Sequence, residues 1–365
     1  MSVISIQATD TLFFRDGRPF SMGEETFAKG IFPPHPSVLH GAIRSVFISD
    51  KMNEGKELKN GISDLIELSK NFSIELVALK QQSLGKEDEE FWFPMPKDLV
   101  VYKSDESKAS ALKLLPSPKY SSLSNFKKIP TSTKDEKTID GLHLISLASF
   151  EYYLNGVSDI GVKHINKLIK KETKIGIGRN ADSHTTEEGR LFRVLMNRPA
   201  VSDNNNIEKL SFVVKVNNLD IKSEGWLALG AERKVASFKK EDDIDIPCPQ
   251  IDSTEFKIYL STPAVFENGW IPENLLKNYD LELVSAAIGR SIDIGGWDLE
   301  NTQPKPMVSM VDAGAVFFVK AKNIDAAKKA ATEIHGQSIT DNPNDIKYSQ
   351  QGFGIAFVGK INANL

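Results

Sequence analysis

The stretch "AGAVFFVKAKNIDAAKKAATEIHG", residues 313–336, places a β-branched and aromatic run directly before a helical pattern that a glycine ends. The run predicts a strand over 313–321, and the apolar spacing predicts a helix over 323–336. Similar patterns around it predict a strand at 255–266, a helix at 272–279, and strands at 280–292 and 352–359. The order βαββαβ is that of a ferredoxin-like domain, in which two helices cover one face of a four-stranded antiparallel sheet and leave the other face free.

The preceding part of the chain predicts a larger unit that begins with a strand, a long loop and a helix. The strand is expected at 2–14 and the helix at 35–50. Charge runs such as "KEDEE" and the stretch "LLPSPKYSSLS" mark residues 83–140 as surface insertions, which we expect outside the core. The other predicted elements are strands at 72–80, 189–197, 209–217 and 225–238 and a helix at 158–171.

A domain boundary is predicted between Lys239 and Ser253, where "KKEDDIDIPCPQIDS" is first charged and then proline-rich. Neither part favours a packed element. We therefore predict an α+β chain of two ferredoxin-like domains. The first spans 1–245 and is enlarged by insertions at about 83–140 and by a loop or hairpin at 172–190, and the second spans 250–365.

Composition limits the classes of protein and partner. The 365 residues are 40% hydrophobic and carry a formal charge of -4, so a polyanionic partner has to be met by a local patch. Cys248 is the single cysteine, which excludes an internal disulfide or a cysteine-rich zinc site and suits a reducing compartment. Without an apolar run of about 20 residues or a signal-peptide pattern, we expect a cytoplasmic protein with no membrane partner.

Arginines concentrate near glycines. The chain has nine arginines against thirty-six lysines, and seven of the nine lie within three residues of a glycine: Arg15, Arg18, Arg44, Arg179, Arg190, Arg233 and Arg290. Glycine allows close backbone approach to a ligand, and the planar guanidinium makes paired hydrogen bonds to phosphate oxygens. The clustering therefore indicates phosphodiester contacts. The alternative for any one arginine is a structural pairing with an acid such as Asp16 or Glu232.

Residues 163–198 add a basic segment, with nine Lys and Arg against four Asp and Glu. Inside it, "KIGIGRNADSHTTEEGRLF" is a glycine-bounded loop or hairpin that offers Arg179, His184 and Arg190 to a ligand. The alternative is a solvated basic helix followed by a flexible loop.

Familiar catalytic patterns are missing from the sequence. "GIGRNADSHTTEEG" lacks the third glycine of a dinucleotide fingerprint, and no glycine-lysine pair precedes Ser or Thr as in a P-loop. The six histidines show no metal-binding spacing, so we expect neither a metal nor a cofactor. A ribonuclease could still use His35, His40 or His184 as a general acid or base.

Several motifs together resemble one family. The stretches "TDTLFFRDGRPF", "FPPHPSVLHGAIRSVF", "GIGRNADSHTTEEGRLF", "GWLALGAERK", "GGWDLENTQPKPMVSMVDAGAVFFV" and "QGFGIAFVG" resemble, in this order, the RAMP subunit of the type III-B CRISPR effector, the Cmr complex, that sits at the 5′ tag of the guide RNA. Proteins of this kind have ferredoxin-like, RRM-related domains with glycine-rich loops. The resemblance implies the same fold for this chain.

The resemblance also implies a non-catalytic role: binding the crRNA 5′ tag and bridging the large polymerase-like subunit to a neighbouring backbone RAMP subunit. The first loop and first helix supply the implied RNA-binding positions Arg15, Arg18, Phe20, His40, Gly41 and Arg44. The basic segment supplies Gly176, Gly178, Arg179, His184 and Arg190. Later stretches supply Gly230, Arg233, Lys234, Gly295, Gly296, Trp297, Lys305 and Pro306.

Phe317 and Phe318 decide how RNA is expected to bind. They are consecutive in a strand and so point to opposite faces, unlike the stacking pair of an RRM. We therefore expect loops to bind the RNA, with Arg18 as a phosphate ligand at the exit of the first strand. Two alternatives remain: an endoribonuclease of the RAMP type that processes precursor crRNA, and a metabolic enzyme of ferredoxin-like fold.

Overall fold

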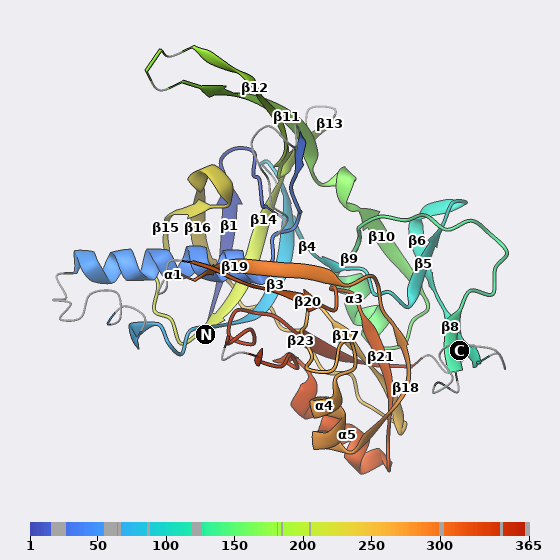
Figure 1. Cartoon of the computed structure of the whole chain (residues 1–365). Helices are drawn as coiled ribbons and strands as arrows, with labels where there is room; N and C mark the ends of the chain where they lie inside the picture. The colour runs from blue at the N-terminus through green and yellow to red at the C-terminus, as the bar shows by residue number, and fades with distance from the viewer. Residues whose placement is uncertain are drawn as a thin grey trace.

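Strands dominate the computed structural model, which combines α-helices with mostly antiparallel sheets (Figure 1). It describes residues 1–15, 27–54, 64, 67–85, 88–117, 126, 128–180, 182–183, 185–203, 206–298, 303–343 and 346–361. Within these ranges, it describes only the backbone of 27–29, 187–190, 203, 206 and 297–298.

The largest sheet has eleven strands and contains the predicted first strand as the third from one edge. From one edge its order is β15 (Glu224–Leu229), β16 (Lys234–Glu241), β1 (Ser2–Ala8), β14 (Asn206–Asn217), β3 (Ser73–Ser83), β4 (Glu89–Pro94), β9 (His143–Ser146), β10 (Asp159–His164), β6 (Asp105–Ala111) and β5 (Leu99–Tyr102), with β13 (Ala200–Asp203) beside β14. Ile4 and Ile6 of β1 are fully buried on one face. The helix α1 (Pro36–Asn53) packs there through Leu39, Ile43 and Phe47.

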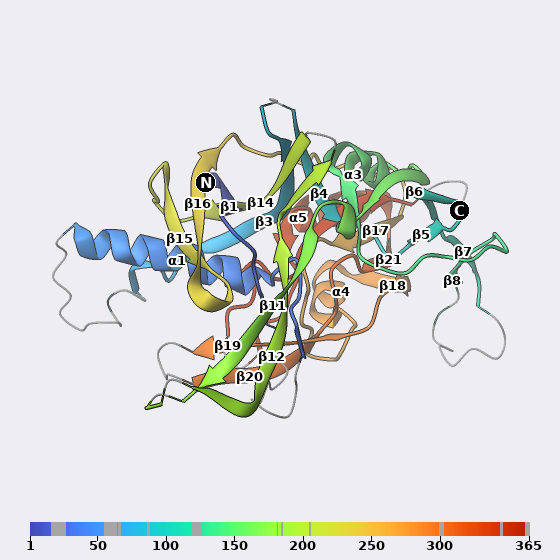
Figure 2. The same cartoon turned by 90° about the horizontal axis from the view of Figure 1, so that it is seen from above.

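Smaller elements extend from this sheet. In β11 (Lys170–Arg179) and β12 (Thr186–Arg198) the basic segment forms a long hairpin that projects from the body (Figures 1 and 2), and β2 (Phe27–Lys29) pairs with β12 in parallel. The others are the hairpin β7 (Lys113–Pro116) and β8 (Lys128–Thr131), the helix α3 (Leu147–Leu154), and the 3₁₀ turns η1 (Ile165–Lys167) and η2 (Ala231–Arg233). Among the described helices, none combines the length and the apolar character needed to cross a membrane.

The C-terminal part has the predicted βαββαβ order: β17 (Glu255–Leu260), α4 (Glu273–Tyr279), β18 (Leu281–Ala287), β21 (Val316–Ala321), α5 (Ile324–Ile334) and β23 (Ile355–Lys360). These strands form an antiparallel sheet in the order β18-β21-β17-β23, with β22 (Gln337–Ser338) added at the edge. A hairpin that we did not predict, β19 (Ile292–Asp298) and β20 (Gln303–Met310), lies in the chain between β18 and β21.

The second face of this C-terminal sheet is covered, so the expectation of a free face is wrong. Phe317 packs in the core beneath α4 and α5, whereas Phe318 belongs to the core of the large sheet. Both are at most 1% exposed. On the covered face, Phe150 of α3 lies 5.1 Å from the Tyr259 ring and 5.4 Å from the Phe357 ring, centroid to centroid. No base can stack on a face that is filled in this way.

Two other expectations are also wrong. Residues 158–171 are not a helix but β10, η1 and the start of β11, because Ile160 and Val162 alternate with exposed residues and Gly161 disfavours a helix. Residues 83–140 do not all lie outside the core, since Trp92, Phe93 and other apolar residues of β4, β5 and β6 are buried in it. The predicted strand at 225–238 is two strands, β15 and β16, separated by a turn.

A buried ion pair joins the two parts of the chain. Lys257 of β17 lies 3.4 Å from Asp98 Oδ2, and the hydroxyl of Tyr153 donates to Asp98 Oδ1 at 2.8 Å. All three residues are at most 2% exposed. The Lys257 ammonium also lies 3.4 Å from the centroid of the Tyr153 ring, a cation–π contact. Burial lowers the pKa of Lys257, and the Asp98 carboxylate opposes that shift.

Candidate nucleic-acid interface

The exit of the first predicted strand is fixed by its apolar residues. Leu12 and Phe14 are buried, and the amide of Leu12 donates to the Asn197 carbonyl at 2.7 Å, next to the base of the β11–β12 hairpin. Arg15, which follows directly, is exposed. Arg18 and Phe20 lie outside the described residues. The aromatic run therefore anchors the segment that presents Arg15 at the surface.

The turn after β15 packs against this exit. The Ala231 amide donates to the Phe13 carbonyl at 2.9 Å, and a Cβ on Gly230 would lie 2.9 Å from that same oxygen. Gly230, Glu232 and Arg233 have φ angles of 69°, 61° and 48°, in the left-handed region. Non-glycine residues held there cost about 1–3 kcal/mol each and are concentrated at functional sites. The turn thus holds the exposed Arg233 in one strained geometry.

Lys234, also a predicted RNA ligand, is held by acids. Its ammonium lies 3.3 Å from Asp10 and 3.4 Å from Glu232. Partial burial lowers the pKa of Lys234, but the hydrogen bonds that its ammonium donates to both carboxylates outweigh this effect and raise that pKa. Lys174 of the hairpin also donates to Glu232, at 2.7 Å, and lowers the pKa of that carboxyl. Lys234 therefore has a structural role in tying the turn to β1, and Lys174 ties the turn to the hairpin.

A hollow of about 490 Å³ lies between α1 and β15. Gly41 and Ser45 of α1 form one side, and Trp226, Gly230 and Arg233 form the other. Trp226 is 65% exposed, unusual for so large an apolar side chain. An exposed aromatic face beside an arginine is the arrangement on which unpaired bases stack in single-stranded nucleic-acid sites.

Among the described residues, none gives Gly41 a packing reason to be glycine. A Cβ at this position would lie more than 4 Å from every described atom outside its own helix backbone. Within a helix, glycine costs about 0.5–1 kcal/mol relative to alanine. The glycine therefore keeps the floor of the hollow open at the expense of stability, as close approach of a backbone or ligand requires.

We expect Gly41→Ala and Gly230→Ala to have opposite effects on stability. Gly41→Ala should raise the free energy of unfolding by about 0.5–1 kcal/mol. Gly230→Ala should lower it by at least about 1–3 kcal/mol, because its Cβ would contact the Phe13 carbonyl at a left-handed φ. Urea unfolding of both variants measures these effects. A loss of stability in Gly41→Ala would show that its glycine serves the fold.

A second group of predicted residues meets on another side of α1. The His40 ring stacks on Phe72 at 4.3 Å between centroids, and Arg44 Nε donates to Ser69 Oγ at 2.7 Å. Burial lowers the pKa of His40 to about 4, helped by the positive charges of Arg44 and of Lys305 from β20. His40 is therefore a neutral, packed ring at pH 7, whereas Arg44 and Lys305 supply positive charge.

The hairpin β11–β12 carries the glycines of the basic segment. Gly176 pairs with Phe192, whose ring would overlap a Cβ at Gly176. This contact explains Gly176 by packing. Gly178 and the exposed Arg179 lie at the far end of β11. His184 lies outside the described residues, and the structure describes only the backbone of Arg190.

The hairpin β19–β20 carries the remaining predicted positions. Gly296 pairs with Lys305, and a Cβ at Gly296 would lie 3.4 Å from Lys305 Cδ. Gly295 lies against Met307, whose sulfur would be 2.6 Å from a Cβ at Gly295. The side chain of Trp297 lies outside the described part. Both glycines therefore let long side chains of β20 cross the hairpin.

The structure also places together residues that we did not single out. Trp226 joins Gly41 and Arg233 at the hollow, and its signal was present in "GWLALGAERK". His143 and His164 face each other with ring centroids 4.9 Å apart, but His143 is only 3% exposed. Within the described ranges, no three His, Cys, Asp or Glu side chains are grouped as metal ligands would be.

Comparisons with known proteins identify the family. Similar chains occur in cryo-EM structures of the "Type III-B Cmr-beta bound to cognate target RNA and AMPPnP, state 1" (TM-score 0.48, 16% identity) and of the "Type III-B Cmr-beta bound to cognate target RNA" (0.47, 17%). Each match covers 87% of this chain and 86% of the other. No curated protein sequence matches. The family model described as "CRISPR-associated protein (Cas_Cmr3)" matches residues 4–361, nearly the whole chain. The chain therefore belongs to the Cas_Cmr3 family of CRISPR-associated proteins, which confirms the resemblance to a subunit of the type III-B Cmr complex.

Proposed function

We propose that this chain is a non-catalytic RNA-binding subunit of a Cmr complex, that it binds the 5′ tag of the crRNA, and that it bridges the large polymerase-like subunit to the backbone RAMP subunits. Its family supports the placement in a Cmr complex. We also propose that the chain has two ferredoxin-like domains. The element order of the C-terminal part supports one of them.

The observation that carries the RNA-binding role is the hollow between α1 and β15. A strained turn holds Arg233 at one side of it, the exposed Trp226 lies beside that turn, and Gly41 leaves the helix surface open. Arginine supplies hydrogen bonds to phosphate, tryptophan a stacking surface, and glycine the room for close approach. In this proposal, Arg44 and Lys305 add positive charge on the neighbouring side of α1.

The projecting hairpin supports the bridging role. Ile175, Ile177 and Leu191 are exposed along this hairpin, which projects from the body (Figure 1). Ile177 pairs directly with Leu191 across the hairpin. Exposed aliphatic side chains on an extended arm are suited to contact with another protein chain. We therefore assign this arm to the neighbouring backbone subunit.

Arg233→Ala should weaken binding of tagged guide RNA by about 1–3 kcal/mol, because one charge-assisted phosphate contact is lost. The slope of log K against log salt should fall by about one. The measurement is a titration of the assembled complex at several salt concentrations, with Arg290→Ala, another exposed arginine near a glycine, as control. Arg18→Ala belongs in the same series. Parent-like binding by Arg233→Ala would contradict its role at the hollow.

The alternative function, a RAMP-type endoribonuclease, calls for a reactive histidine. His40 is stacked on Phe72 and neutral, and the pKa of His35 is also lowered by burial. We expect the chain to leave precursor crRNA uncut, and His40→Ala to change nothing in that assay. Cleavage by the purified parent that His40→Ala abolishes would favour the nuclease over the structural subunit.

A further inference from the structure

The five strands β15, β16, β1, β14 and β3 form a sheet region with a polar face opposite α1. Helix α1 packs on the face that carries Ile4 and Ile6. The opposite face carries small polar side chains in register. Gln7 of β1 pairs with Ser237 of β16, and Ser211 lies on the neighbouring strand β14. Ser211 is buried at the floor of this face, whereas Gln7 and Ser237 are half-buried, so the polar face near the β15 edge of the sheet is a candidate interaction surface.

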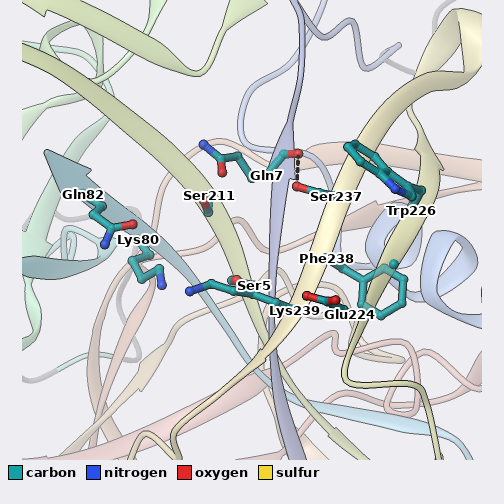
Figure 3. Close-up of a pocket in the computed structure, with 11 residues that line it drawn as sticks. Ser5, Gln7, Lys80, Gln82, Ser211, Glu224, Trp226, Ser237, Phe238 and Lys239 are labelled. Atoms are coloured by element: carbon teal, nitrogen blue, oxygen red, sulfur yellow. Dashed lines mark hydrogen bonds between the residues drawn. The ribbon is translucent and has the colours of Figure 1, made fainter. Parts of the chain in front are cut away.

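This face is hollowed along its length. One hollow of 440 Å³ is lined by Ser5, Lys80 and Trp226, among others, as Figure 3 shows. A second of 400 Å³ is lined by Thr9, Arg198 and Lys209, among others. Both include Gln7 and Ser237, so the two hollows form one continuous groove. We call it the sheet groove. Its elongated shape suits an extended chain better than a compact ligand.

The charges around the sheet groove cancel one another. The Lys80 ammonium donates to Glu89 at 2.9 Å and to Glu241 at 2.7 Å, and Lys239 lies 3.2 Å from the same Glu241 carboxylate. At the other end, Arg198 Nε donates to Glu172 at 2.5 Å. Cations that are already paired with carboxylates attract a phosphodiester backbone weakly, because RNA binding gains from lysines and arginines that neutralise phosphates and release the counterions condensed on the RNA. The groove therefore disfavours nucleic acid.

The uncharged groups of the sheet groove suit a polypeptide. The amide side chains of Gln7 and Gln82 line it, and each offers both donors and an acceptor, as a peptide backbone does (Figure 3). At its edge, Val235 of β16 pairs with Ala228 of β15 and is 51% exposed, and β15 is the edge strand of the sheet. An exposed apolar side chain can pack against a partner chain, and an edge strand has free backbone hydrogen-bonding groups.

We propose that the sheet groove docks an extended, uncharged segment of a neighbouring protein subunit in the complex. This inference depends on the chain acting within a Cmr complex, but not on where the chain binds RNA. The segment crosses the strands from Gln82 of β3 past Gln7 of β1, hydrogen-bonds to both amide side chains and to the serine hydroxyls, and ends at the β15 edge beside Val235. Crosslinking tests this assignment directly. Gln7→p-benzoylphenylalanine, irradiated in the assembled complex, should crosslink to another polypeptide.

Each outcome of that experiment decides the matter. A crosslink to the guide or target RNA, or no crosslink in a complex that assembles, overturns the proposal. The unmodified protein gives a second readout that requires no substitution: backbone amides of β15 should exchange hydrogen at least about tenfold more slowly in the complex than in the isolated chain. Unchanged exchange there also overturns it.

A matched pair of substitutions separates this proposal from the RNA-binding role. Ser237→Arg, in the middle of the sheet groove, should weaken assembly at least tenfold at an unchanged melting temperature, whereas Ser104→Arg, an exposed serine in the turn between β5 and β6, should not. Tag binding by the assembled parent is measured separately. If Gln7 crosslinks to protein but the tag does not bind, the docking surface stands and the RNA role falls.

Discussion

Asp98→Ala should lower the free energy of unfolding by about 3–5 kcal/mol, the largest effect we expect from a single polar substitution in this chain. The change leaves the Lys257 ammonium buried without a counter-ion and removes the acceptor of the Tyr153 hydroxyl. Burial already lowers the pKa of Lys257, so losing the carboxylate favours its neutral form further. Urea unfolding at pH 7 measures the loss.

The double variant Asp98→Ala, Lys257→Met separates the cost of a buried, unpaired charge from the contribution of the ion pair itself. Replacing both partners by apolar groups removes the unpaired charge, so the double variant should recover much of the stability that the single one loses. Tyr153→Phe should cost only about 1 kcal/mol, the net value of one hydrogen bond. If Asp98→Ala has the same free energy of unfolding as the parent, water reaches Lys257, and the ion pair does not stabilise the contact between the two parts.

Acid should destabilise the folded chain well above the pH at which carboxylates titrate. His40 has a folded pKa of about 4, below the usual 6.5, so its contribution is complete above pH 6.5 and is lost as the pH falls toward 4. Between pH 6.5 and pH 4, His40 binds a proton in the unfolded chain but stays neutral in the folded chain. The loss reaches up to about 3 kcal/mol at pH 4. Burial also lowers the pKa of His35, His143 and His335, which adds in the same direction.

The measurement is the free energy of unfolding between pH 8 and pH 5, for the parent and for His40→Gln. The glutamine variant should show a shallower decline below pH 6.5, because it removes one proton uptake on unfolding. His164→Gln is the matched control, since it removes an imidazole outside the α1 contact with Phe72. An identical pH profile for His40→Gln and the parent would contradict the assignment.

The C-terminal elements could be predicted because each has its own local signal. The helix α5 has an asparagine cap at Asn323, whose side chain accepts from the Ala326 amide, and alanines on its buried face. The β19–β20 hairpin was missed because Gly295, Gly296 and the prolines at 304 and 306 interrupt its strand pattern. The helix predicted at 158–171 failed for the opposite reason. Its apolar residues fit both periods, and the local signal of Gly161 is reinforced by pairing with β9 and β6, which favours a strand.

The candidate site could be predicted in composition but not in arrangement. The clustering of glycine and arginine singled out the segment Gly230–Arg233, which forms a turn whose left-handed residues no composition could reveal. It did not distinguish Arg233, which is exposed, from Lys234, which Asp10 and Glu232 hold. The surroundings of Trp226 and of the buried His143 are formed by segments that are distant in sequence. Such contacts leave no local pattern.

The strand β21 has a mechanical consequence, because its neighbouring residues Phe317 and Phe318 belong to two different cores. Phe150 also packs against Tyr259 and Phe357. The two parts of the chain therefore share apolar packing, which opposes sliding of one part over the other. We therefore expect the two parts to move as one rigid unit and not about a hinge. We expect a molecule held at α1 and another held near α4 and α5 to keep one separation, because the packing between the two parts is shared.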